Sequence, residues 1–223
     1  SKRIKKKNIK NFKGKPILAW TIGNIINSKK FNRIFVSTDE KNIAEIAVKY
    51  GAEVPFLRPN YLAKDNTKAI DAIYYTFRKA EKLYKKKYDY IIELLCTNPF
   101  KKAFHIVDVV KKQVSSNADS VIAISKLEDH HPIRIKKIVN GRIKNFCLKE
   151  IPETRRQDLK PDAYIRCGSI YSMRRDMLMK KIRYGTKNSL AYIMSEKYVV
   201  NIDTERDFDF ANFLIKKNYK NGK

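Results

Sequence analysis

The amino-acid sequence predicts an α/β fold in which a mainly parallel sheet is covered by helices on both faces. Short apolar runs alternate with amphipathic segments of roughly 10–15 residues, the pattern expected of parallel strands joined by helices. The chain has 223 residues, of which 43% are hydrophobic, enough to bury one substantial core. We therefore expect a single domain over 1–223, with a small insertion at 127–160.

The first half of the chain shows the clearest alternation. A β-rich run at 34–39 predicts a strand, and apolar residues at helical spacing over 43–50 predict a helix that Gly51 ends. The segment 71–86 repeats apolar residues on one face, which predicts a longer amphipathic helix. The same reasoning predicts a helix at 106–114 and strands at 54–57, 90–95 and 120–125.

The pattern changes after residue 125. Two strand-like runs, 133–139 and 142–146, flank Asn140-Gly141. Asn-Gly between such runs is the strongest short-range hairpin signal, because both turn positions need positive φ. Insertions of this kind often cover a partner subunit or an active site. Beyond the hairpin we expect strands at 168–173 and 198–202, then a helix at 205–217 with Thr204 as its N-cap.

Lysine and arginine outnumber acidic residues by 49 to 23, which gives a net charge of +26. This charge raises the alternative of a basic nucleic-acid-binding module. The lysines are spread over nearly every polar stretch, however, which is more typical of solvated surface that helps attract an anionic substrate. Three widely spaced cysteines predict reduced thiols in a cytoplasmic protein. No apolar run approaches the ~20 residues of a membrane span.

Two segments suit phosphate chemistry. Asp203 leaves a predicted buried strand directly before a helix, the position where open α/β sheets bind ligands. Its carboxylate could hold Mg²⁺ against phosphate oxygens, or it could simply cap the helix with Thr204. The chain start can likewise be a phosphate-binding turn or a solvated basic tail. The candidate residues in this segment are Ser1, Lys2, Arg3, Lys7 and Asn8.

Polar residues after two further strands are also candidates. Arg58 and Asp65 follow the predicted strand 54–57, and an arginine there could pair with a nucleotide or remain on the surface. Arg155-Arg156-Gln157 lies in a polar loop after the hairpin. Two adjacent guanidinium groups suit bidentate recognition of a carboxylate or phosphate.

Taken in order, these motifs resemble the acylneuraminate cytidylyltransferases, which are the CMP-sialic acid synthetases and their relatives acting on other nonulosonic acids. The matching landmarks cover the whole chain in the expected order. They are Ser1-Lys2-Arg3, Lys7-Asn8, Gly14-Lys15-Pro16, Val36-Ser37-Thr38-Asp39, Tyr50-Gly51-Ala52-Glu53-Val54, Arg58-Pro59, Thr97-Asn98-Pro99, His130-His131-Pro132, Arg156-Gln157, Gly168-Ser169-Ile170-Tyr171 and Ile202-Asp203-Thr204-Glu205.

The resemblance implies a three-layer Rossmann-like nucleotidyltransferase fold and a Mg²⁺-dependent reaction. The anomeric hydroxyl of a 2-keto sugar acid would attack the α-phosphorus of CTP and release pyrophosphate. Lys7 would be the main catalytic cation, and Asp203, with Asn201, would hold the metal. The nucleotide would be bound by Ser1, Lys2, Arg3, Asn8, Arg58 and Asp65.

The resemblance also implies a homodimer formed through the hairpin insertion. Arg156 and Gln157 would reach the active site of the neighbouring subunit, and Tyr171 would line the sugar pocket. Three departures from the family pattern matter. Asn201 replaces an aspartate of the usual Asp-Ile-Asp, so a second metal carboxylate becomes an amide. The run 93–99 lacks a glutamine associated with sugar recognition, which leaves a deoxyoctulosonate- or pseudaminate-type acid open as the substrate.

The third departure concerns the chain start. The family's Ala-Arg-Gly-Gly stretch and its strand would lie before Ser1, so we expect a gap in the sheet where that strand belongs. A catalytically silent relative, kept for assembly, is a further alternative.

Overall fold

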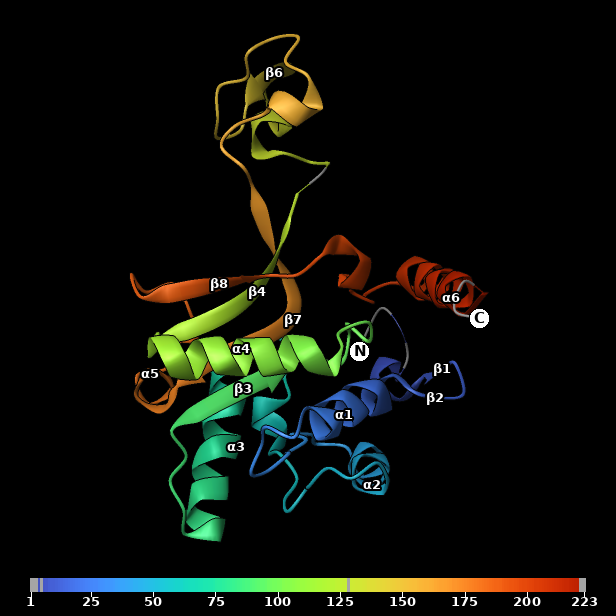
Figure 1. The fold of residues 1–223 in the computed structure, drawn as a ribbon, viewed down its shortest axis with the longest axis vertical. Coiled ribbons are helices and arrows are strands. Elements are labelled where there is room, and N and C mark those ends of the chain that lie inside the picture. The colour runs from blue at the N-terminus through green and yellow to red at the C-terminus, as the bar shows by residue number, and fades with distance from the viewer. Residues whose placement is uncertain (1–3, 5, 128, 221–223) are drawn as a thin grey trace.

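The centre of the molecule is a four-stranded sheet with strand order β3-β7-β4-β8 (Figure 1). A computed structural model describes residues 4, 6–127 and 129–220 of the chain. The strands are β3 (Tyr90–Leu94), β4 (Ser120–Lys126), β7 (Tyr164–Arg174) and β8 (Ser189–Ile193). β7 pairs antiparallel with both β3 and β4, while β4 and β8 are parallel.

The sheet is therefore mixed, with β3, β4 and β8 running in one direction and β7 running the opposite way between two of them. The sequence predicts the shared direction of β3 and β4 but not the reversal. β7 is reversed because it brings the chain back from an excursion that starts at the end of β4.

Helices cover both faces of this sheet. On one face α4 (Ala103–Ser116) places Ile106 and Val109 in a buried cluster with Val121 and Ile170. On the other face Phe77 packs against the sheet in a second cluster; it belongs to α3 (Ala69–Tyr84), which lies with α5 (Arg175–Met179). These three layers agree with the expected fold class.

The N-terminal elements pack beside α4. After a 3₁₀ turn at η1 (Lys7–Ile9), the short strands β1 (Asn11–Phe12) and β2 (Lys15–Pro16) lead into α1 (Ile17–Ser28). α1 contacts α4 and packs against α2 (Lys41–Lys49). Phe12 is buried against the final helix, α6 (Glu205–Lys220), through an edge contact with Phe208.

An arm projects from the sheet on the extended ends of β4 and β7 (Figure 1). It carries the predicted hairpin, in which β5 (Lys136–Val139) and β6 (Arg142–Asn145) pair antiparallel around Asn140-Gly141. Both turn residues have positive φ, as the hairpin signal requires. Two 3₁₀ turns, η3 (Pro132–Arg134) and η4 (Arg156–Asp158), complete the arm.

A cavity of about 900 Å³ lies between β3 and the segment 34–39. Phe35 forms an isolated parallel bridge with Glu53, and β3 is the end strand of its sheet. The amide of Val36 and the carbonyl of Ile34 bond to Glu53. Since strand residues alternate, the backbone groups of Phe35 point away from Glu53. The predicted strand 34–39 is thus reduced to one bridge, and 54–57 forms no strand, because Pro55 has no N–H to extend the pairing from Glu53.

The last part of the chain differs from prediction in one element and agrees in another. The predicted strand 198–202 is instead the end of η5 (Glu196–Tyr198) followed by irregular chain, and β8 lies earlier. Thr204 does cap α6, because its hydroxyl accepts from the Asp207 amide while the Asp207 carboxylate accepts from the Thr204 amide. In the described residues, no helix is long and apolar enough to cross a membrane.

Candidate functional site

The predicted catalytic cation and the predicted metal-binding carboxylate are in direct contact. Lys7 Nζ donates to Asp203 Oδ1 at 2.8 Å, and the amide of Asn201 donates to the other oxygen, Oδ2. The Lys7 side chain is 12% exposed and that of Asp203 is 46% exposed, so the pair lies at the protein surface with one open side. A second ion pair lies on the same two segments, where Lys10 Nζ donates to Glu205 Oε2 at 2.5 Å.

The loop after β3 connects this pair to the rest of the site. The thiol of Cys96 donates to Asn8 Oδ1 at 3.3 Å, and the carbonyl of Thr97 accepts from the Ile202 amide at 2.8 Å. Asn8 follows Lys7, and Ile202 precedes Asp203. The loop therefore fixes both segments at the carboxyl edge of β3, where open α/β sheets bind ligands.

The donor groups fit a Mg²⁺ ion that arrives with a triphosphate. Asp203 supplies an exposed carboxylate and Asn201 an amide, whose side chain lies 3.6 Å from where a Cβ on Gly168 would stand. That distance is an ordinary contact, so glycine is favoured at position 168 by its positive φ and not by a lack of space. Mg²⁺ is commonly held by one or two carboxylates together with substrate phosphates and water. Among the described residues, no group of three or more His, Cys, Asp or Glu side chains could hold a metal by itself.

Arg58 lines the cavity between β3 and residues 34–39, together with Asn8. Its guanidinium pairs with Asp39 at 3.1 Å, and its backbone amide donates to the Thr38 carbonyl. The cavity therefore brings two of the predicted nucleotide-binding residues together. Asp65 lies exposed in a turn before α3 and is not among the residues lining this cavity.

Tyr171 is buried on β7 and is only 5% exposed. The Arg183 guanidinium stacks on its ring at 4.0 Å and forms an ion pair with Glu93 on the paired strand. Burial raises the pKa of Glu93, and the nearby Arg183 opposes that shift. Tyr171 thus packs against Arg183, which holds Glu93 on the neighbouring strand, and it is not among the residues that line the cavity. Sequence reasoning did not indicate Arg183.

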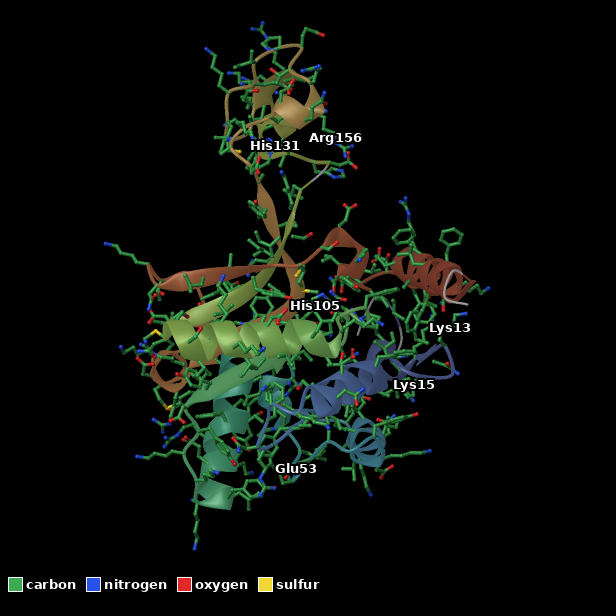
Figure 2. All side chains as sticks on the ribbon, in the orientation of Figure 1. Lys13, Lys15, Glu53, His105, His131 and Arg156 are labelled. Carbon is green, nitrogen blue, oxygen red and sulfur yellow. The ribbon has the colours of Figure 1, made fainter. Side chains whose placement is uncertain are left out.

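Arg156 and Gln157 lie on the arm, away from Lys15 and the rest of the body (Figure 2). Arg156 binds Asp129 at 2.7 Å, and its side chain is half exposed. Within one chain, these two residues are not brought to the Lys7–Asp203 pair. Ser1, Lys2 and Arg3 lie outside the described residues.

Sequence reasoning also missed Lys101, which is fully buried under the loop after β3. Its Nζ contacts the Leu95 carbonyl at 2.6 Å, the Asn98 carbonyl at 2.5 Å and the Thr21 hydroxyl at 3.0 Å. Burial lowers the pKa of Lys101 to about 7. The sequence gives little signal for this role, because Lys101 follows Phe100 and is the first of two adjacent lysines, only one of which is buried.

The arrangement suits the binding and positioning of a nucleoside triphosphate. A largely buried ammonium is suited to neutralise phosphate charge, and an exposed carboxylate with an amide beside it is suited to bind a hard cation. The acceptor side chain of Asn8 and the guanidinium of Arg58 border one cavity. Reactions at phosphorus depend mainly on such charge neutralisation and alignment.

Comparisons with known proteins identify the family. A cytidylyltransferase family model matches residues 1–206. The chain is 31% identical over 215 residues to the CMP-N,N'-diacetyllegionaminic acid synthase of Campylobacter jejuni, covering 96% of this chain and 90% of that protein. It is 29% identical over 221 residues to a pseudaminic acid cytidylyltransferase of Campylobacter jejuni, covering 99% and 94%.

A solved structure shows the same fold. CMP:2-keto-3-deoxy-manno-octonic acid synthetase complexed with CTP matches with a TM-score of 0.70 and 16% identity, covering 98% of this chain and 95% of that one. This likeness supports the nucleotidyltransferase fold that the motif order implies. Together with the family model and the similarity over nearly the whole chain, it leads to one conclusion: this chain belongs to the cytidylyltransferase family.

Proposed function

We propose that this chain transfers CMP from CTP to the anomeric hydroxyl of a nonulosonic acid and releases pyrophosphate. The contact between Lys7 and Asp203 at the carboxyl edge of β3 is the observation that carries the proposal. It joins a phosphate-binding cation to a metal-binding carboxylate in a chain whose family acts on cytidine nucleotides. A net charge of +26 favours binding of two anionic substrates.

Each residue of the site has a distinct part in this reaction. Lys7 binds phosphate oxygens and stabilises the negative charge of the departing pyrophosphate. Asn8 and Arg58 bind the nucleotide along the cavity that they both line. Asp203 and Asn201 would hold Mg²⁺, which neutralises phosphate charge and orients the α-phosphorus for in-line attack. Because the sugar hydroxyl and CTP are held together, attack becomes effectively intramolecular.

The sugar substrate is proposed to be a pseudaminate- or legionaminate-type acid. Relatives at 29% and 31% identity carry the names of those two sugars. Leu95, within the run that lacks the family glutamine, also favours a nonulosonic acid other than sialic acid. Tyr171 and Arg183 would act on sugar binding by shaping the sheet face rather than by direct contact.

We further propose that the active enzyme is a homodimer joined through the arm. Ile138 and Ile143 form a cross-strand pair on the hairpin and are 77% and 75% exposed. An apolar pair exposed at the tip of an arm is the kind of surface that a second subunit covers. Such a dimer would bring Arg156 and Gln157 to the partner's site, where a guanidinium suits the sugar carboxylate. A cytoplasmic location remains a prediction from the sequence.

A third part of the proposal concerns the cavity between β3 and Phe35. We propose that an extended apolar segment, joined N-terminal to Ser1, can insert there as a strand parallel to β3. The outer edge of β3 and the backbone groups of Phe35 supply hydrogen-bonding edges on the two sides. Apolar residues of α1, α3 and α4 line the same cavity, which suits a strand that is apolar on both faces.

Pyrophosphate release from CTP tests the central proposal. The purified chain, with and without an N-terminal apolar strand, is assayed with Mg²⁺ and a panel of pseudaminic, legionaminic, sialic and 3-deoxyoctulosonic acids. We expect CTP-dependent release with one of the first two sugars. Binding of CTP without release for any sugar would support a silent relative instead. Tight, salt-sensitive DNA binding without turnover would support the nucleic-acid alternative.

A further inference from the structure

Lys101 has a contact set that is unusual for a buried lysine. Its side chain is 0% exposed, and the part of the chain that the structure describes offers it no carboxylate within ion-pair distance. Instead, Nζ contacts two backbone carbonyls and one hydroxyl, as measured above. A buried amine without a counter-charge costs free energy, so its hydrogen bonds must be satisfied for the fold to tolerate it.

The two carbonyls belong to the loop after β3, at its first residue, Leu95, and its fourth, Asn98. Between them lie Cys96 and Thr97, the two residues that contact Asn8 and Ile202. The third contact, to Thr21, ties the same amine to α1. One nitrogen atom therefore joins α1 to both ends of the loop. Through the loop it is connected to the segment that contains Asn8 and to the segment that contains Ile202.

These contacts hold in either protonation state of the amine. As an ammonium, Lys101 donates to all three oxygens; as a neutral amine, it donates to the two carbonyls and accepts from the Thr21 hydroxyl. The groups facing it are Cys96, Cys167 and His105, none of which supplies a full negative charge at neutral pH. Lys101 can therefore make all three contacts on either side of its pKa of about 7.

We propose that Lys101 is a positioning residue of this transferase site. It holds the loop 95–98, so that Cys96 keeps Asn8 in place and Thr97 keeps Ile202, the residue before Asp203, in place. The inference rests on the proposed function, because it takes the Lys7–Asp203 pair as the place where CTP reacts. Lys101 itself touches no reacting atom. Its effect on turnover is transmitted through the loop.

The test compares four variants of the full chain. Lys101→Met removes the amine and keeps the length of the side chain, and Thr21→Val removes one of the three contacts without changing shape. Lys111→Met removes an exposed lysine from α4. Leu178→Ala creates a cavity in the core cluster that Leu178 of α5 forms with Phe77 and Met173, which includes no residue of the loop, and controls for loss of stability.

The measurements are the kcat and KM for CTP, taken well below every variant's Tm, and the rate at which a thiol reagent labels Cys96. Peptide mapping separates Cys96 from the exposed Cys147. We expect Lys101→Met to lower kcat/KM at least tenfold and to speed Cys96 labelling, with a smaller change in the same direction for Thr21→Val. Lys111→Met should match the wild type, and Leu178→Ala should lower Tm while leaving kcat/KM and labelling unchanged.

Wild-type kcat/KM and unchanged Cys96 labelling in folded Lys101→Met would overturn the inference. An equal fall in kcat/KM for Leu178→Ala at matched Tm would also overturn it, because general destabilisation would then explain the effect. A wild-type protein that transfers CMP to no sugar acid would refute the proposed function. Cys96 labelling and amide exchange at Ile202 would in that case still show whether Lys101 holds the loop.

Discussion

Lys7 Nζ and Asp203 Oδ1 lie 2.8 Å apart although 196 residues separate them in the sequence. The contact links the turn before α1 to the start of α6, and the Lys10–Glu205 contact runs beside it. Since the Lys7 side chain is only 12% exposed, the Asp203 carboxylate is the counter-charge that compensates its burial. The chain therefore concentrates one cation and one carboxylate at the point where the proposed reaction takes place.

Replacing the carboxylate should abolish metal-dependent turnover. We expect Asp203→Ala to lower the rate of pyrophosphate release by roughly a hundredfold or more, because bound metal stabilises the transition state by several kcal/mol. Asp209→Ala, an exposed carboxylate on α6, is the matched control and should behave as wild type. Near-normal release by Asp203→Ala would show that this residue does not hold the metal.

Replacing the cation should weaken both binding and catalysis. Lys7→Met should raise the KM for CTP and lower kcat, together reducing kcat/KM by about ten- to a hundredfold, since charged hydrogen bonds contribute roughly 1.5–3 kcal/mol. Lys6→Met removes the exposed lysine directly before Lys7 and should change little. If both variants lost activity equally, the general basic character of the segment, not Lys7, would account for CTP binding.

Mixing two inactive variants tests whether the dimer shares its sites. Arg156→Met should be inactive as a homodimer if this guanidinium acts in the partner's site, and Asp203→Ala should be inactive through loss of the carboxylate. After subunit exchange, the mixed dimer contains one site with both residues intact, so pyrophosphate release should reappear. No recovery, with co-purification of differently tagged subunits showing that mixed dimers form, would place Arg156 in the site of its own subunit, and an active Arg156→Met homodimer would place it outside the reaction.

The buried amine of Lys101 predicts a pH-dependent stability. Its folded pKa, about 7, is below the usual 10.5, so the unfolded chain binds more protons between these values and stability rises with pH there. The charged form is disfavoured in the fold at lower pH. We would measure the free energy of unfolding by urea from pH 6.5 to 9. Above pH 7, the difference between wild type and Lys101→Met should rise in favour of the wild type by up to ~1.4 kcal/mol per pH unit. A constant difference would mean that the pKa is not lowered.

Adding a strand should stabilise the protein. We expect an N-terminal extension of about seven residues rich in Val and Ile, joined to Ser1 through Gly-Gly, to fill the cavity beside β3. Each buried apolar side chain contributes about 1.5–3 kcal/mol before the cost of ordering, so Tm should rise by several degrees. An extension of equal length with a central proline and charged residues is the control. Equal Tm values for the two extensions would argue against a strand at this position.

Elements with strong local signals were predictable. The helices α2, α3, α4 and α6 form where apolar residues recur at helical spacing, and the hairpin forms where Asn140-Gly141 accepts positive φ at both turn positions. β8 was missed because it pairs in the described sheet only with β4, along one edge, and its residues are half exposed. A strand of that kind lacks the continuous apolar run of a buried one.

By itself, the sequence determined the α/β class and the order of motifs that marks the family, because these are carried by neighbouring residues. Only the tertiary structure decided that β7 runs against β3 and β4, and that the arm carries Arg156 away from its own site. It also decided which side chains meet: Asn8 with Cys96, and Lys7 with Asp203. Contacts across such separations follow from how helices and strands pack, and no local spacing encodes them.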